Sequence, residues 1–344
     1  MEMRECTEEW KSRRIGKGGL PEDYALVMAY MKELRAHNRT RRVYDVNPYC
    51  EVYSFRDNVF GLFGENCDPA GDFWQYLIVG EEKAMLIDTG FGLGDMKRLC
   101  DELTGGKELI VVNTHAHPDH SYGNRRFDRI FCHAYCVPLL EAQDEHIYDY
   151  LFDEKGDPRF LSFDRRDLPA YRKYEIVPCR GGHIFDLGGG CEIELLWVPG
   201  HVSGHAMFLD KKDRILFAGD GMCAHVSGEG TGKYRTDPWF MYNNLESYRD
   251  QLRKVAKRLD EFDSVFPNHY QTDLPADAII PAILEACDAI LDKGEEDRVE
   301  MYRTGEGFLE ERHYRFIKGF SMLGYQSDGG FKRPEGTVWP APGA

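Results

Sequence analysis

Short strand-like runs that end in a polar residue recur through the middle of the chain and restrict the folds that it can adopt. Four of them are ELIVVNTH, EIELLWVPGH, RILFAGD and SVFPNH. Residues with helical spacing lie between such runs, at 96–103, 134–142 and 245–259. Alternation of strands and helices over roughly 220 residues predicts a single α/β or α+β domain.

Composition excludes several classes of protein. Of the 344 residues, 42% are hydrophobic and 30% are charged, which suits a folded chain with a buried core. The 43 Lys and Arg against 59 Asp and Glu give a net charge of -16. This charge repels polyanions, so we expect neither a nucleic-acid nor an anionic membrane partner. Without a signal-like stretch at the start or an apolar run of about 18 residues, the expected location is cytoplasmic.

The ten cysteines are scattered and include no CxxC pair. A disulfide framework is typical of short secreted chains, so reduced and buried thiols are expected here. Cys132 and Cys136 come closest to a metal-binding pair. They occur where the run RIFCHAYCVPLL is typical of a strand that enters a helix, which disfavours a metal role.

The densest group of chemically active side chains follows the run ELIVV directly. It comprises His115, His117, Asp119 and His120 in the segment THAHPDH. Residues two apart in extended chain point the same way, so His115 and His117 can reach one cation together. Pro118 suits the first turn of a following helix. Such groups after a buried strand lose solvation unless something binds them, and zinc, iron and manganese accept these ligands.

The motif HxHxDH after a strand resembles the signature of the metallo-β-lactamase superfamily. Four further elements resemble those of the family and occur in its order, so that the resemblance covers about residues 49–270. They are Asp88 in MLIDTG, His201 in VPGHVSGH, Asp220 in FAGD and His269 in FPNHY. The resemblance implies an α/β (α+β) fold, a four-layer αβ/βα sandwich, with an N-terminal extension and C-terminal helices.

The resemblance also implies a centre of two divalent metal ions. Zinc is the expected metal, with iron or manganese as alternatives. The first ion would be held by His115, His117 and His201, the second by Asp119, His120 and His269, and both by Asp220. Asp88 would support the ligand loops without binding a metal. Such ions lower the pKa of bound water, so that a metal-bound hydroxide can attack a carbonyl.

Branch choice within the family depends on a few positions. The redox di-iron branch carries a glutamate where His117 stands and has no ligand where His120 stands. Several true β-lactamases have cysteine or serine where Asp220 stands. PGHVSGH and AGD resemble glyoxalase II and acyl-homoserine lactonases, which implies a hydrolase of a small ester, lactone or thioester. The chain offers no convincing match to the basic residues by which glyoxalase II binds glutathione.

Further residues are candidates for catalysis or substrate binding. The candidate catalytic residues are Asp119, His205 and Tyr270. His205 could orient a ligand or stabilise a turn, and Tyr270 could donate to a developing oxyanion or pack in the core. Tyr122 stands where many members have glycine and could line the pocket or pack beside the helix. The candidate substrate-binding residues are Tyr122, Lys233, Tyr234, Arg235, Trp239 and Phe240.

The predicted organisation has three parts. Residues 1–48 form an extension with a helix at 20–34, residues 49–272 form the catalytic domain, and residues 273–344 form a helical segment and tail. Helices are expected at 274–291 and 299–323. Residues 143–175 and 221–244 are predicted insertions that could be lids, interface loops or surface decoration.

Four functional hypotheses follow. A small-molecule ester, lactone or thioester hydrolase leads. A phosphodiesterase and a β-lactam hydrolase use the same kind of centre, and a non-catalytic binding module is the alternative outside the enzymes. Apolar sequence outside the main domain also makes a homodimer possible.

Overall fold

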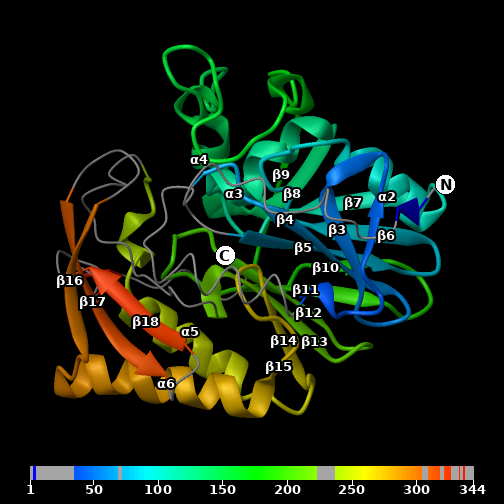
Figure 1. Cartoon of the computed structure of the whole chain (residues 1–344). Coiled ribbons are helices and arrows are strands. Elements are labelled where there is room, and N and C mark those ends of the chain that lie inside the picture. The colour runs from blue at the N-terminus through cyan, green and yellow to red at the C-terminus, as the bar shows by residue number, and fades with distance from the viewer. Residues whose placement is uncertain are drawn as a thin grey trace.

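Two β-sheets pack face to face in this protein, with helices on the outer side of each (Figure 1). The computed structural model describes residues 3–4, 35–68, 72–222, 237–303, 309–317, 321–326, 333 and 336–337. The helix predicted at 20–34 lies outside the described residues, as do Lys233, Tyr234 and Arg235.

The first sheet has nine strands in sequence order. They are β1 (Met3–Arg4), β2 (Arg42–Tyr44), β3 (Asn47–Ser54), β4 (Val59–Glu65), β5 (Asp72–Val79), β6 (Lys83–Ile87), β7 (Glu108–Val112), β8 (Arg129–His133) and β9 (Glu175–Cys179). Neighbours pair antiparallel from β1 to β6 and parallel from β6 to β9. Parallel neighbours need a crossover, and α2 (Met96–Thr104) supplies it between β6 and β7.

The second sheet has six strands, also in sequence order. They are β10 (Ile184–Asp186), β11 (Glu192–Trp197), β12 (Ala206–Asp210), β13 (Ile215–Gly219), β14 (Ser264–Pro267) and β15 (Leu274–Pro275). Only β13 and β14 pair in parallel, and α5 (Leu245–Ala256) lies between them in the chain. The strand-like runs of the sequence thus all lie in the two sheets.

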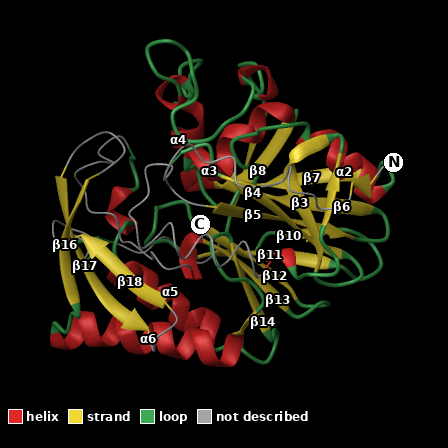
Figure 2. Ribbon diagram, in the orientation of Figure 1, coloured by secondary structure: helices red, strands yellow, loops and turns green. Residues whose placement is uncertain are grey.

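Three hydrophobic clusters define four layers. The cluster between the sheets joins residues such as Trp74 and Tyr76 of β5 to Phe208 and Phe217 of β12 and β13. A second cluster packs α2 against the outer face of the first sheet, and a third packs α5 and α6 (Ala276–Lys293) against the second sheet. The order helix, sheet, sheet, helix is visible in Figure 2 and confirms the predicted fold class.

The helix boundaries follow from local chemistry. Asp95 accepts a hydrogen bond from Arg98 N at the start of α2, and Asn244 accepts one from Ser247 N at the start of α5. Gly294, with φ of 67°, ends α6 in the left-handed conformation that glycine adopts without strain. These helices match the predictions for 96–103, 245–259 and 274–291. None of the helices in the described part of the chain combines the length and hydropathy needed to cross a membrane.

The prediction of a further helix over 299–323 is wrong. The described residues there form a third, antiparallel sheet of β16 (Arg298–Arg303), β17 (Leu309–Ile317) and β18 (Ser321–Gln326). Tyr314, Ile317, Leu323 and Tyr325 are buried, and three of these four belong to the cluster that contains α6. Packing of these side chains against α6 therefore stabilises strands here in spite of the helical spacing.

The connections between these elements are short helices. After β7 come α3 (Pro118–Ser121) and η2 (Tyr122–Arg126), and after β8 come η3 (Ala134–Cys136) and α4 (Val137–Glu141). The segment 143–175 contains η4 (Asp149–Leu151) and η5 (Arg165–Asp167). Residues of that segment, among them Ile147, Tyr148 and Leu151, form a separate apolar cluster with Phe91 and Cys67. After β13 come η6 (Asp220–Met222) and η7 (Phe240–Tyr242).

Candidate metal centre

The predicted site residues follow the carboxyl ends of several strands. Asp88 follows β6 and His115 follows β7, and these two strands run parallel. His201, Asp220 and His269 follow β11, β13 and β14, which run in one direction in the second sheet. Polar groups from both sheets therefore meet at one edge of the sandwich.

One group of four side chains could hold a metal ion. It consists of His115, His117, His201 and Asp220, whose ligand atoms all lie within 4.8 Å of one another. His117 Nδ1 is 3.0 Å from His115 Nε2 and 3.0 Å from His201 Nε2. The three ring nitrogens cannot all form hydrogen bonds to one another. A divalent cation between them would accept a lone pair from each.

A second group of three side chains lies beside the first. Asp119, His120 and His269 are buried, and their ligand atoms also lie within 4.8 Å of one another. The Asp119 carboxylate is 3.3 Å from His269 Nε2 through Oδ2 and 3.7 Å from His120 Nε2 through Oδ1. Imidazole nitrogen with carboxylate oxygen is the donor set that zinc, iron and manganese accept.

Asp220 faces both groups, one oxygen to each. Its Oδ2 is 3.5 Å from His201 Nε2 and 4.0 Å from His115 Nε2. Its Oδ1 is 3.1 Å from His120 Nε2 and 3.5 Å from His269 Nε2. The geometry could therefore place one carboxylate between two cations, and the residues fit such ions.

The outer nitrogens of three histidines are engaged elsewhere, which turns the inner nitrogens toward the centre. His115 Nδ1 is 3.0 Å from Thr114 Oγ1, and His120 Nδ1 donates to Asp88 Oδ2 at 2.9 Å. His269 Nδ1 donates to the carbonyl of Asp72 at 2.8 Å. Bonds of this kind select the tautomer and orient a ligating ring.

Asp88 holds the loops together from behind. Its Oδ1 accepts from Thr114 N, and its Oδ2 accepts from Thr114 Oγ1, from His120 and from Asn268 Nδ2. The residue is fully buried and has φ of 64°, an uncommon conformation for a residue with a side chain. Such a conformation persists only where the surroundings hold it, and here it aims the carboxylate at the segment 114–120 and at the loop after β14.

Burial and mutual charge perturb the titratable groups strongly. Burial lowers the pKa of His115 well below its usual value. Burial alone would raise the pKa of Asp119, but His120 and His269 outweigh it and hold this pKa at about 2. Burial would lower the pKa of His120, but Asp220 and the other carboxylates raise it to about 10. Groups with opposed perturbations gathered at one sheet edge are typical of a functional site.

The two remaining candidates for catalysis lie at the margin of this centre. His205 is fully buried, donates from Nδ1 to the carbonyl of Val198, and burial lowers its pKa to about 3. A Cβ at Gly219 would lie 2.6 Å from His205 Nε2, so the ring packs on the backbone that carries Asp220. The carbonyl of Tyr270 accepts from Trp74 Nε1, and the ring lies 6.1 Å from that of His269.

The candidate substrate-binding residues divide into two places. Tyr122 packs edge-on against Phe91 and Tyr148, in the cluster formed with the segment 143–175. Trp239 is 36% exposed and stacks on Tyr135 with ring centroids 4.3 Å apart, and Phe240 opens η7 beside it. Lys233, Tyr234 and Arg235 lie outside the described residues.

Three residues near the centre escaped the sequence analysis. Asn66 donates to Asp119, Asn268 donates to Asp88, and the edge of Phe73 lies against His120. Asn268 directly precedes His269 in FPNHY, so its position was a usable signal. Asn66 and Phe73 belong to no motif. Eight cysteines of the described chain are buried and form no disulfide there, and neither candidate ligand group contains one.

Comparison with known proteins gives one family match. The family model for the metallo-beta-lactamase superfamily matches residues 74–262. Two solved structures with similar folds are the metallo-beta-lactamase from Pontibacter korlensis and a metallo-beta-lactamase family protein from Thermus thermophilus. The first has a TM-score of 0.47 and 15% identity, covering 70% of this chain and 99% of that one. The second has a TM-score of 0.45 and 21% identity, covering 72% of this chain and 85% of that one.

Curated relatives carry thioesterase names. The acyl-coenzyme A thioesterase MBLAC2 of Homo sapiens is 25% identical over 219 residues, which cover 57% of this chain and 72% of that protein. The protein of the same name from Gallus gallus is 25% identical over 213 residues, covering 57% and 71%. The atrochrysone carboxyl ACP thioesterase of Aspergillus fumigatus is 26% identical over 183 residues, covering 52% and 45%.

Proposed function

Because the chain belongs to the metallo-β-lactamase superfamily, we propose that it is a metal-dependent hydrolase that cleaves acyl thioesters of small molecules. The single observation that carries the proposal is the position of Asp220 between two groups of ligand atoms. Thioesterase names among the relatives favour the thioester over the ester and the lactone.

In this proposal the ligands are those of the two groups. His115, His117 and His201 would hold one ion, Asp119, His120 and His269 would hold the other, and Asp220 would offer an oxygen to each. Zinc is the proposed metal, with iron and manganese as alternatives. Ions bound there supply a Lewis acid for the carbonyl and lower the pKa of water that reaches them.

The other residues orient this machinery. Asp88 fixes Thr114 and His120, so the ligand loop keeps its shape when substrate enters. His205 supports the backbone of Asp220 as a neutral ring, a positioning role. Tyr270 could donate its hydroxyl to the developing oxyanion. Tyr122, Trp239 and Phe240 supply apolar surface for an acyl chain, and Lys233, Tyr234 and Arg235, which precede Trp239 in the sequence, are proposed to bind the rest of the substrate.

A substrate panel tests the proposal. The zinc-loaded protein is mixed with butyryl-, octanoyl- and palmitoyl-coenzyme A, and the released thiol is measured with a chromogenic disulfide. Matched p-nitrophenyl esters, a lactone, a β-lactam and bis(p-nitrophenyl) phosphate complete the panel. We expect thioester turnover that a chelator abolishes and zinc restores.

The matched variants are His117→Ala and His146→Ala. His117 belongs to the first group, whereas His146 is a surface histidine whose side chain is 69% exposed. We expect only the first variant to lose activity, by at least about 100-fold, since a metal ion contributes several kcal/mol to catalysis. If the phosphodiester or the β-lactam is turned over faster than the thioesters, that substrate class would replace the thioester in the proposal. If no substrate shows turnover that the chelator abolishes, the proposal of a metal-dependent hydrolase is contradicted.

A further inference from the structure

Asn66 connects the loop after β4 to a carboxylate of the proposed centre. Its side chain is 3% exposed, and Nδ2 donates to Asp119 Oδ2 at 3.1 Å. The same carboxylate faces His269 through Oδ2 and His120 through Oδ1. An amide donor on Oδ2 fixes the rotation of the carboxyl group and therefore determines where its remaining lone pairs point.

The next two residues of this loop are anchored to the segment 143–175. Cys67 is 1% exposed and belongs to the apolar cluster that contains Tyr148, Leu151 and Phe91. Asp68 Oδ2 accepts a hydrogen bond from Tyr150 Oη at 3.2 Å, and Tyr150 lies in η4. Asn66 is thus directed at the proposed centre, while Cys67 and Asp68 are held by the insertion.

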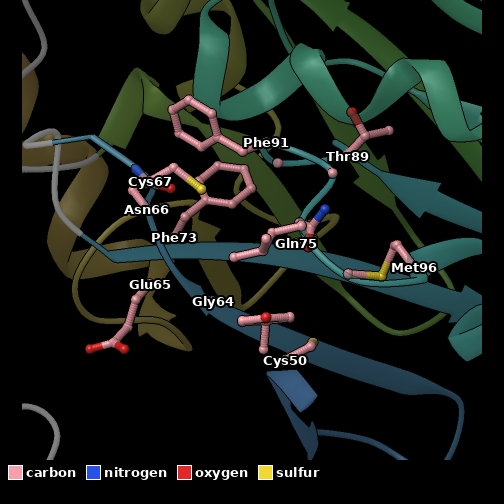
Figure 3. Close-up of a pocket in the computed structure, with 14 residues that line it drawn as sticks. Cys50, Gly64, Glu65, Asn66, Cys67, Phe73, Gln75, Thr89, Phe91 and Met96 are labelled. Carbon is pink, nitrogen blue, oxygen red and sulfur yellow. The ribbon is translucent and has the colours of Figure 1, made fainter. Parts of the chain in front are cut away.

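A cavity lies beside this loop, so the loop needs the contacts of Cys67 and Asp68 to hold its position. Asn66, Cys67, Phe73 and Phe91 are among the residues that line a cavity of about 40 Å³, and Figure 3 shows these four near one another. A volume of this size is larger than a single water requires, so side chains do not fill that side of the loop. On that side, the contacts of Cys67 and Asp68 are those that restrain the loop that carries Asn66.

We propose that Asn66 is a positioning residue for Asp119 and that the segment 143–175 holds Asn66 in place through Cys67 and Asp68. The proposal rests on the metal centre proposed above, to which it adds a role for the insertion. The insertion then acts on the affinity of the second ion without contacting that ion. Tyr150 offers the smallest change that tests this effect on ion affinity, because only its hydroxyl group bonds to Asp68.

Zinc affinity tests the proposal without any substrate. Zinc is titrated into the full-length protein in competition with a fluorescent chelator. Asn66→Leu keeps the bulk of the side chain and removes the donor, and we expect it to bind one of two zinc ions about 10- to 100-fold more weakly. Asn66→Gln keeps the amide and should lose less. Tyr150→Phe removes only the hydrogen bond to Asp68 and should weaken the same ion about twofold to tenfold.

Two control variants match these changes. Asn58→Ala removes another amide-to-carboxylate bond, that to Asp213, which lies at the opposite end of β13 from Asp220. Tyr171→Phe removes a hydroxyl from the same segment, where the Tyr171 ring packs under Arg125. Both should keep the zinc affinity of the wild-type protein, and melting midpoints show whether each variant is folded.

The outcomes separate this proposal from the proposed function. Two zinc ions bound by Asn66→Leu with wild-type affinity would overturn the role of Asn66. Wild-type affinity in Tyr150→Phe would overturn the role of the insertion. A wild-type protein that binds no zinc would instead overturn the metal centre itself, and this proposal with it.

Discussion

The carboxylate of Asp220 reaches both groups of candidate ligands at once. Its two oxygens lie 3.1 to 4.0 Å from four histidine nitrogens. Every other candidate ligand belongs to one group only. Replacement of Asp220 should therefore affect both ions, whereas replacement of another ligand should affect chiefly one.

Asp220→Ala tests this difference. On the proposed function, we expect the zinc content to fall from two ions per chain toward none and the rate of thioester hydrolysis to fall by at least about 100-fold. Zinc is measured by atomic emission after gel filtration, and the rate by thiol release. Asp277→Ala, at an exposed position of α6, is the control and should keep both. Retention of two ions by Asp220→Ala would contradict the bridging role.

Local motifs explain which site residues could be predicted. Four candidate ligands lie within six consecutive positions, so their spacing alone indicates that they bind metal together. They are His115, His117, Asp119 and His120. Asn66 is 53 residues from Asp119 in the sequence, and the contact between them arises only from the pairing of strands. Asn66 belongs to no periodic pattern or motif in the sequence that could indicate its contact with Asp119.

A carboxyl group with a raised pKa lies at the end of β12, where the turn to β13 begins. Asp210 is fully buried, and its Oδ1 accepts from Asp213 N at 3.0 Å. Burial and the carboxylate of Asp213 raise the pKa of Asp210 to about 7, against the opposing effect of the backbone N–H groups. Asn58 in turn donates to Asp213, so this turn also contacts the other sheet.

Stability should therefore depend on pH through Asp210. Between about pH 4 and pH 7 the unfolded chain loses the proton that the folded chain keeps, so the free energy of unfolding falls as the pH rises. Asp210→Asn stays neutral and avoids this loss. Its advantage over the wild-type protein should grow by about 2 kcal/mol from pH 5 to pH 7.5.

Urea unfolding of both proteins at several pH values measures this difference. Asp57→Asn, which changes an exposed aspartate in another turn, is the control variant and is measured at the same pH values. A difference between Asp210→Asn and the wild-type protein that stays constant with pH would mean that the pKa of Asp210 is not raised in the folded protein.

The elements of the main domain could be predicted because α2 and α5 bury one face with helical spacing, and because strands buried on both faces, such as β12 and β13, are short apolar runs. The C-terminal sheet could not, although its signals were present. Val299, Tyr302 and Phe316 favour strands, and glycine-containing segments separate β16, β17 and β18. Apolar residues in short runs fit either period, and only the packing of this sheet on α6 decides between them.

At the scale of the whole molecule, ligand binding and folding should be linked. The His and Asp side chains of the two groups lose solvation at one edge of the sandwich, and bound ions would recover that loss. A chelator should lower the melting midpoint by about 5 °C or more, because ligand at 100 times its Kd stabilises by about 2.7 kcal/mol. Zinc should restore the midpoint in the wild-type protein and not in His117→Ala. An unchanged midpoint with chelator would contradict the linkage.

The net charge of -16 should also appear in the kinetics. Coenzyme A thioesters are anionic, so the protein should repel them at low ionic strength. We expect kcat/KM for such a substrate to rise a few-fold between about 20 and 200 mM salt. An uncharged N-acetylcysteamine thioester with the same acyl chain is the control and should show no change. A fall with salt for the coenzyme A thioester would indicate a local basic site that attracts it.

Some expectations about the whole molecule stay predictions. These are the boundaries of the three parts at 1–48, 49–272 and 273–344, the homodimer and the cytoplasmic location. The homodimer and the location concern contacts between copies and the surroundings of the chain, which residue spacing within one chain does not encode.

The division of the candidate ligands between the two sheets has a consequence for partly unfolded molecules. His115, His117, Asp119 and His120 follow β7 of the first sheet, whereas His201, Asp220 and His269 follow strands of the second. Ions held between them would cross-link the halves of the sandwich. A molecule whose halves begin to separate would release its ions in the same event, so a damaged copy would become inert instead of attacking substrates indiscriminately.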